Sequence, residues 1–270
     1  MKVFEGTKNE YYMDGYLHDN LCTAKSVITK DWDMIFLYDG SEGSGKSVKA
    51  MQDAYFCDET LNIDRITFTP FQFKKGVLSA KKYQAVVYDE AYTGLSSRAT
   101  MSSINRTLIS MLAEIRQKNL FIFIVMPTFF DLDKYVALWR SRALIHVYTK
   151  RPFIRGFFTF FNAEKKKSLY ILGKKFYDYN CVNADFYGRF TNHYVIDEVE
   201  YRKKKRLSLM DREKKAEEKS IKEDLDNRLF ERLQSLDVKI THELKIKILS
   251  MPSSTYYRKL KKFEEMKEWE

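Results

Sequence analysis

The sequence predicts an α/β protein, with a parallel β-sheet covered by helices on both faces and a helical region after it. Short apolar segments alternate with segments of helical spacing between residues 33 and 150, which is the pattern of a parallel sheet built from strand–helix repeats. A glycine-rich loop separates the first apolar segment from the first helical one. Beyond about residue 197 the chain is dense in charge and contains no glycine, which predicts exposed helices.

Five apolar segments have the length of strands. They cover residues 33–40, 65–70, 83–91, 120–126 and 142–150. Nearly continuous apolar runs of this length are typical of strands that are buried on both faces. Residues 46–56 and 105–119 have helical spacing, and the second segment places its apolar side chains on one face. Those side chains are Leu108, Met111, Leu112 and Ile115.

The second half of the chain predicts three further parts. Residues 153–161 and 165–172 are expected to be strands of a small antiparallel extension. With this extension, the first domain spans residues 1–196. A charged helical linker follows over residues 197–234, and a small helical module over residues 235–270.

Composition restricts the partners of the chain. Its 270 residues hold 47 Lys and Arg against 37 Asp and Glu, a net charge of +10 with a pI near 9.2. A basic surplus of this size suits a polyanion, either a nucleic acid or an anionic membrane surface. The last 70 residues, 201–270, hold 20 Lys and Arg against 14 Asp and Glu, so most of the surplus lies in the tail.

The cysteines and the apolar segments exclude several classes of protein. Cys22, Cys57 and Cys181 are far apart and form no CxxC or Cys/His pattern, so neither a disulfide framework nor a zinc site is expected. The longest apolar run, residues 120–126, ends at Pro127 and is too short to cross a bilayer. The start of the chain has no apolar signal core. We therefore expect a cytoplasmic protein without an integral membrane segment, although a peripheral role at a membrane stays open.

The glycine-rich loop has the spacing of a phosphate-binding P-loop, G-x-x-x-x-G-K-[ST]. It consists of Gly40, Ser41, Glu42, Gly43, Ser44, Gly45, Lys46 and Ser47. The glycines let backbone N–H groups turn toward a phosphate, and the helix that follows directs its positive end at the same anion. Lys46 is expected to reach the β- and γ-phosphates, and the Ser47 hydroxyl to bind Mg²⁺. The cofactors expected are thus ATP and Mg²⁺.

Two adjacent acids end the third apolar segment. Asp89 is placed to hold a magnesium-bound water, and Glu90 to polarise an attacking water. Their alternative is an ordinary strand end with two solvated carboxylates. Together with a complete P-loop about forty residues upstream, the pair favours ATP hydrolysis over phosphoryl transfer to a small molecule.

A hydrolytic site also needs a group that senses the γ-phosphate and a cation for the transition state. Thr128 follows the strand of residues 120–126 and is the candidate sensor, although a turn or helix-capping threonine is an equal alternative. Several arginines lie in the same part of the chain. Arg98 and Arg116 are the candidates for an arginine finger supplied across a subunit interface, the alternative for each being a surface ion pair.

The order of these motifs resembles the ASCE division of P-loop ATPases, and within it the HerA/FtsK superfamily. The segments "YDGSEGSGKS", "AVVYDEA" and "EIRQKNLFIFIVMPTFFDLD" carry the resemblance, which covers about residues 34–150. The superfamily includes viral genome-packaging ATPases and zonular occludens toxin-like proteins of filamentous phages. Its members often have Gln or Asn at the end of the sensor strand, where this chain has Met126, Pro127 and Thr128. The resemblance implies ATP-driven movement of DNA by a homo-oligomeric ring, such as a hexamer, in the cytoplasm of a host cell.

The tail resembles a helix-turn-helix. "THELKIKIL" begins with a threonine cap, "SMPS" is a turn, and "SSTYYRKLKKF" starts a second helix. In the resolvase-like pattern that the second helix resembles, its start would face DNA bases and its lysines the phosphates. The candidate DNA-binding residues are Ser254, Thr255, Tyr257, Arg258, Lys259, Lys261 and Lys262. The alternative is a helical hairpin that packs on another part of the protein.

Three functions fit these features. The first is a DNA motor of a virus, plasmid or other mobile element that hydrolyses ATP to translocate or package DNA. The second is a DNA-binding regulator or partition switch controlled by ATP. The third is a membrane-associated phage-assembly ATPase of the zonular occludens toxin-like kind.

Overall fold

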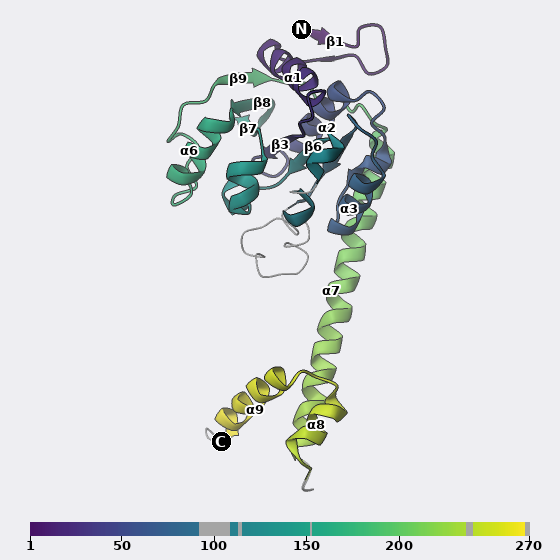
Figure 1. Cartoon of the computed structure of the whole chain (residues 1–270), viewed down its shortest axis with the longest axis vertical. Coiled ribbons are helices and arrows are strands. Elements are labelled where there is room, and N and C mark those ends of the chain that lie inside the picture. Colours follow the sequence, from purple (N-terminus) through teal and green to yellow (C-terminus); the bar gives the residue numbers. More distant parts are fainter. Residues whose placement is uncertain (92–108, 113–114, 152, 236–239, 268–270) are drawn as a thin grey trace. The chain divides into compact units, whose positions relative to one another are not determined.

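The computed structural model describes residues 1–91, 109–112, 115–151, 153–235 and 240–267. The chain divides into two compact units, Met1–Lys205 and Arg206–Glu270 (Figure 1). Helix α7 (Glu198–Ser235) contributes its first turns to the first unit and the rest to the second.

The first unit is a mixed α/β structure around one seven-stranded sheet, as the sequence predicts. The strand order is β4–β5–β6–β3–β7–β8–β9. The strands are β3 (Met34–Asp39), β4 (Ile66–Thr67), β5 (Ala85–Tyr88), β6 (Phe121–Val125), β7 (Ala143–Lys150), β8 (Ile154–Phe161) and β9 (Phe186–Arg189). The first five are parallel, and β8 and β9 extend the sheet antiparallel. A separate two-stranded ribbon pairs β1 (Lys2–Val3) with β2 (Tyr11–Tyr12).

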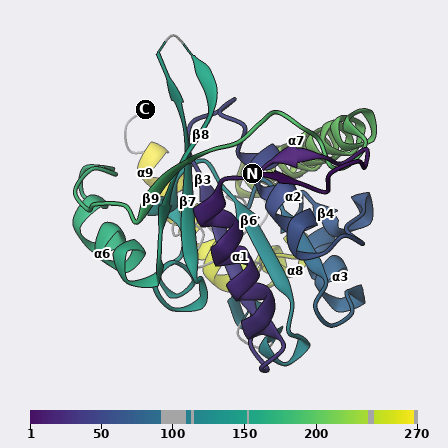
Figure 2. The same cartoon turned by 90° about the horizontal axis from the view of Figure 1, so that it is seen from above.

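Helices cover both faces of the sheet because successive strand residues point to opposite sides. On β3, Phe36 and Tyr38 join one core cluster, whereas Ile35 and Leu37 join the other. Helices α1 (Gly15–Ile28) and α2 (Lys46–Cys57) cover the first side, and α3 (Pro70–Ser79) and α6 (Ala163–Gly173) the second. Figure 2 shows α1 lying across the sheet. Shorter helical turns are Ile63–Arg65, Ile115–Lys118, Phe129–Asp131 and Val136–Arg140.

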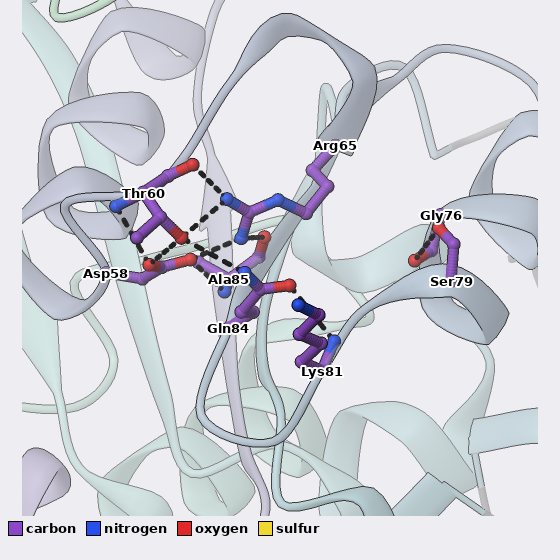
Figure 3. Close-up of polar contacts among 8 residues, drawn as sticks. All are labelled: Asp58, Thr60, Arg65, Gly76, Ser79, Lys81, Gln84 and Ala85. Atoms are coloured by element: carbon purple, nitrogen blue, oxygen red, sulfur yellow. Dashed lines mark hydrogen bonds and ion pairs between the residues drawn. The ribbon is translucent and has the colours of Figure 1, made fainter.

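A polar network holds the start of β5, the strand that leads to the predicted acid pair (Figure 3). The Asp58 carboxylate accepts a hydrogen bond of 2.8 Å from the backbone N–H of Ala85 and pairs with the guanidinium of Arg65. Arg65 also donates to the Ala85 carbonyl at 3.1 Å. Although burial alone would raise it, the pKa of Asp58 is lowered by these donors and by Thr60. The network therefore holds the first residue of β5 in place.

The prediction of a strand over residues 165–172 is wrong, because this segment lies in helix α6. The Asn162 side chain caps the helix by accepting from the backbone N–H groups of Glu164 and Lys165, each at 3.0 Å. Buried positions recur at Lys166, Leu169, Tyr170 and Gly173, which is a helical spacing. The strand predicted over residues 153–161 is confirmed as β8. Of the helix predicted over residues 105–119, residues 109–112 are helical and Ile115–Lys118 forms a 3₁₀ turn. Asn119 is not helical, and residues 105–108 and 113–114 lie outside the described residues.

The second unit contains the later part of α7 with α8 (His242–Leu249) and α9 (Ser253–Lys267). Tyr256 of α9 is fully buried and packs edge-on against Phe230 of α7. Its hydroxyl lies 2.8 Å from His242 Nδ1 and accepts from Gln234 Nε2 at 3.1 Å. Ser250, between α8 and α9, has a positive φ of 47° that makes the turn short. These contacts join the three helices through one aromatic side chain.

Candidate functional site

The glycine-rich loop, residues 40–47, lies between the carboxyl end of β3 and the start of α2. Gly40 has φ of 134°, and a Cβ at this position would lie 1.8 Å from the Val147 carbonyl oxygen on β7. Gly45, the first residue before α2, has φ of 98°. Both positions therefore require glycine, Gly40 for the close approach of β7 and Gly45 for its backbone conformation.

The Lys46 ammonium lies over this loop. Its Nζ donates to the carbonyl oxygens of Gly40 at 2.7 Å and Ser41 at 2.8 Å. Burial lowers the pKa of Lys46, and the carboxylates of Asp39, Asp89 and Glu90 act in the opposite direction. Three carboxylates from two strands therefore lie within electrostatic range of one lysine.

The acid pair meets the loop directly. Asp89 is 2% exposed, and its Oδ1 accepts from the Ser47 hydroxyl at 3.1 Å. Glu90 is half-buried and has a positive φ of 65°, a backbone strain that is common at functional sites. The sequence predicted both residues for one site, and the structure brings them together with Lys46 and Ser47.

Helix α7 contributes two residues that the sequence analysis did not assign to the site. The Tyr201 hydroxyl donates to Asp89 Oδ2 at 2.6 Å. Lys205 Nζ lies 3.2 Å from the same oxygen and 2.9 Å from Glu90 Oε1. Burial alone would lower the pKa of Lys205, but the two carboxylates outweigh it and raise that pKa. The basic segment "YRKKKR", residues 201–206, is the feature of the sequence that could have indicated them.

The candidate sensor lies in a second polar cluster at the same edge of the sheet. Thr128 Oγ1 is 3.3 Å from the Tyr179 hydroxyl, which donates to Asp39. Asp39 also pairs with His146 Nδ1 at 2.9 Å, and the rings of His146 and Tyr179 stack 3.9 Å apart. The Gly40 N–H donates to the carbonyl of Pro127 at 3.3 Å. The base of the glycine-rich loop is thus joined to the segment that carries Thr128.

The two arginine candidates are not brought to this site. Arg98 lies outside the described residues. The Arg116 guanidinium lies 5.2 Å from the ring centre of Trp32, just before β3 begins, and hence at the opposite edge of the sheet from the loop. A role for Arg116 stays a prediction that requires a second subunit. Arg155 of β8 is closer, because a Cβ on Gly43 would lie 3.6 Å from its guanidinium.

The residues present fit a magnesium–nucleotide complex. Mg²⁺ prefers oxygen ligands and commonly takes one or two from the protein and others from phosphates. The Ser47 hydroxyl and the Asp89 carboxylate are such a pair, already 3.1 Å apart. Among the described residues, no group of three or more His, Cys, Asp or Glu side chains could hold a metal ion by itself.

The candidate DNA-binding residues lie on α9 in the second unit. Ser254, Tyr257, Arg258, Lys261 and Lys262 are exposed, whereas Thr255 and Lys259 are half-buried. Lys259 Nζ donates to Asn227 Oδ1 of α7 at 2.5 Å. The Tyr257 ring also packs within the unit, 6.0 Å from the ring centre of His242 on α8. DNA binding by the seven residues stays a prediction.

Comparisons with known proteins add little. No protein-family model matches the chain, and no curated protein matches its sequence. Among solved structures, the N-terminal domain of zonular occludens toxin from Neisseria meningitidis is similar over 63% of this chain and 98% of that one, at 18% identity and a TM-score of 0.38. The fold therefore rests on the strand order given above. In the described part of the chain, no helix is long and apolar enough to cross a membrane.

Proposed function

We propose that this chain is a P-loop ATPase of the ASCE division, of the HerA/FtsK kind, that hydrolyses ATP to move DNA. The observation that carries the proposal is the convergence of Lys46, Ser47, Asp89 and Glu90 at one edge of the sheet. Strand β6 lies between β3 and β5. This order puts the end of β6, with Thr128, at the same edge as the loop and the acid pair.

Each residue has a role that its position supports. The backbone N–H groups of the loop and Lys46 hold the phosphates, and Ser47 and Asp89 hold the metal. Mg²⁺ supplies positive charge that neutralises the phosphate oxygens. Glu90, beside Asp89 and half-exposed, accepts a proton from the attacking water. Lys205 must release Asp89 and Glu90 before they take these roles, because its ammonium lies on both carboxylates.

Movement of DNA is proposed from the charge of the chain and from its tail. A net charge of +10 favours a polyanionic partner. The exposed hydroxyl and basic residues of α9 are available to contact one. A homo-oligomeric ring is part of the proposal, because a DNA motor of this kind encloses the DNA in a ring.

The test is ATP turnover with and without double-stranded DNA, combined with a measurement of molecular mass in solution. A motor gives turnover that DNA increases several-fold, from an oligomer. A slow rate that DNA does not change would instead support the DNA-binding regulator and contradict the motor.

Two variants test the site itself. Lys46→Ala removes the phosphate ligand and should abolish ATP binding or turnover without unfolding the protein. Glu90→Gln keeps the shape of the side chain but not its charge, so that ATP still binds and turnover falls by two or more orders of magnitude, roughly the range for loss of a general base. Wild-type turnover in either variant would contradict the assignment.

A further inference from the structure

The hairpin of β7 and β8 carries an unusual surface. Residues 143–161, which form the hairpin, include Lys150, Arg151 and Arg155 and no Asp or Glu. The hairpin leaves the sheet at the same edge as the glycine-rich loop, because β7 is parallel to β3. In Figure 2 it stands clear of α1, α2 and α6. Cations on such an exposed element point to an anionic partner.

Aromatic rings form a continuous row on one face of this hairpin. From the sensor cluster outward, His146 and Tyr148 stack 6.3 Å apart, and Tyr148 and Phe157 stack 5.9 Å apart. Register places Arg189 of β9 opposite Phe157 and Tyr187 opposite Thr159, so both lie on the same face. The row therefore leads from the nucleotide site toward the tip of the hairpin.

Two rings, one at the turn of the hairpin and one on the neighbouring strand β9, are exposed to solvent. Phe153 at the tip is 89% exposed, and Tyr187 on β9 is 68% exposed. Single exposed rings are common on protein surfaces, but exposed rings that are grouped and bordered by polar residues mark interaction sites. Tyr148 is half-buried. Burial raises the pKa of the Tyr148 phenol, and the electrostatic effect of the nearby Tyr187 raises it further. Three rings are thus available on one strip.

Cations lie on this surface as well. Lys150 Nζ lies 4.4 Å from the ring centre of Phe157, and the Arg189 guanidinium lies 5.1 Å from the same ring. Arg151 is exposed beside Phe153. We name this surface the hairpin strip. It consists of Tyr148, Lys150, Arg151, Phe153, Tyr187 and Arg189.

We propose that the hairpin strip binds single-stranded nucleic acid, with bases on its rings and phosphates on its cations. Sequence-tolerant binding of single strands combines these two features, since every base has a face that can stack. The bases of a duplex are already stacked on each other, so exposed rings favour an unpaired strand. This inference rests on the proposed motor function and extends it, because it names the surface on which the motor holds DNA.

Side-chain contacts connect the hairpin strip with the residues proposed for ATP hydrolysis. Arg155 lies between the tip of the hairpin and the glycine-rich loop, near Gly43. At the other end of the row, His146 stacks on Tyr179, which contacts Thr128. Tyr148 of the strip is therefore joined to the candidate sensor by three side-chain contacts, through His146 and Tyr179.

The test uses the full chain and a fluorescently labelled oligothymidylate, with binding followed by fluorescence anisotropy. Phe153→Ala and Tyr187→Ala should each weaken binding roughly 5- to 150-fold, the range for loss of one stacking partner. Arg151→Gln should flatten the slope of log affinity against log salt by about 0.7, the value for one phosphate contact on a single strand.

Matched controls lie at the end of α6. Phe176 is 76% exposed, and Lys175 Nζ is 5.1 Å from its ring centre, so this pair has the same chemistry away from the strip. Phe176→Ala and Lys175→Gln should leave the affinity and the salt slope unchanged. An equal loss in these controls, or wild-type affinity in the strip variants, would overturn the inference.

Two further probes identify the partner. With a duplex of matched length, the ring variants should lose little affinity, and an equal loss on the duplex would refute base stacking. With phosphatidylserine vesicles, a loss of binding in strip variants that still bind oligothymidylate normally would make the strip a membrane surface.

The outcomes also separate this inference from the proposed function. If the wild type hydrolyses ATP faster with DNA but the strip variants bind normally, only the hairpin strip is refuted. If the wild type binds neither form of DNA, the motor itself is refuted. Basal turnover of the strip variants should equal that of the wild type.

Discussion

Lys205→Met tests whether helix α7 supplies a cation that takes the place of magnesium. The substitution keeps most of the apolar stem and removes the ammonium. In the structure this ammonium lies 3.2 Å from Asp89 Oδ2 and 2.9 Å from Glu90 Oε1, and the Lys205 side chain is 28% exposed. Without it, the buried Asp89 carboxylate loses its nearest cation.

The cost follows from burial and from the contacts that remain. Removing one partner of a fully buried ion pair costs about 3–5 kcal/mol, and an exposed pair contributes about 0–1 kcal/mol. Lys205 lies between these cases, and Asp89 keeps hydrogen bonds from Tyr201, Ser47 and the Glu90 N–H. We expect a loss of about 1–2 kcal/mol in the free energy of unfolding, or about 2–8 °C in Tm for a unit of this size.

Magnesium and nucleotide should remove this difference. Mg²⁺ bound between Ser47 and Asp89 supplies the charge that Lys205 supplied, so the deficit of the variant should shrink when Mg²⁺ and a non-hydrolysable ATP analogue are added. The assay is calorimetric unfolding of both proteins with and without these ligands. Lys203→Met, at an exposed position of the same helix, is the control. An equal deficit in both conditions, or none without ligand, would refute the reasoning.

Three other perturbations follow from particular contacts. Gly40→Ala should lower the free energy of unfolding by about 3 kcal/mol or more, since its Cβ would lie 1.8 Å from the Val147 oxygen at an unfavourable φ; an unchanged urea midpoint would contradict this. Lys166 is buried, and burial lowers its pKa to about 7, so the folded state holds fewer protons than the unfolded state between pH 7 and the unfolded pKa. The free energy of unfolding of the wild type should therefore rise with pH in this window. Lys166→Met should be more stable than the wild type at pH 7, by as much as about 5 kcal/mol, and this advantage should decline toward pH 10. A difference in urea unfolding that does not depend on pH would show that the ammonium is not destabilising. If Arg258 contacts a base, Arg258→Ala should weaken binding to a preferred DNA site by about 1–3 kcal/mol and binding to random DNA by little. Equal losses on both DNAs, measured by competition binding, would show that this arginine contacts only a phosphate.

Local patterns in the sequence were sufficient to predict the strands and the residues that the structure brings together at the glycine-rich loop. The glycine-rich loop, the Lys46–Ser47 pair and the Asp89–Glu90 pair each depend on a few adjacent residues, and parallel strands bring their carboxyl ends to one edge. The same reasoning failed for residues 165–172, because a short segment with apolar and basic residues fits either period. Asn162, three residues before this segment, was the overlooked sign of a helix.

The remaining parts of the site depend on contacts between residues that are distant in the sequence. Tyr201 and Asp89 are separated by 112 positions, and Tyr179 and Asp39 by 140. No spacing rule predicts such pairs, because the chain between them is free to take many paths until the core is packed. The sequence by itself therefore determined which residues form the glycine-rich loop and the acid pair. Only the tertiary structure decided that α7 returns to place Lys205 on those acids, since burial of Tyr201 against the sheet holds the first turns of the helix there.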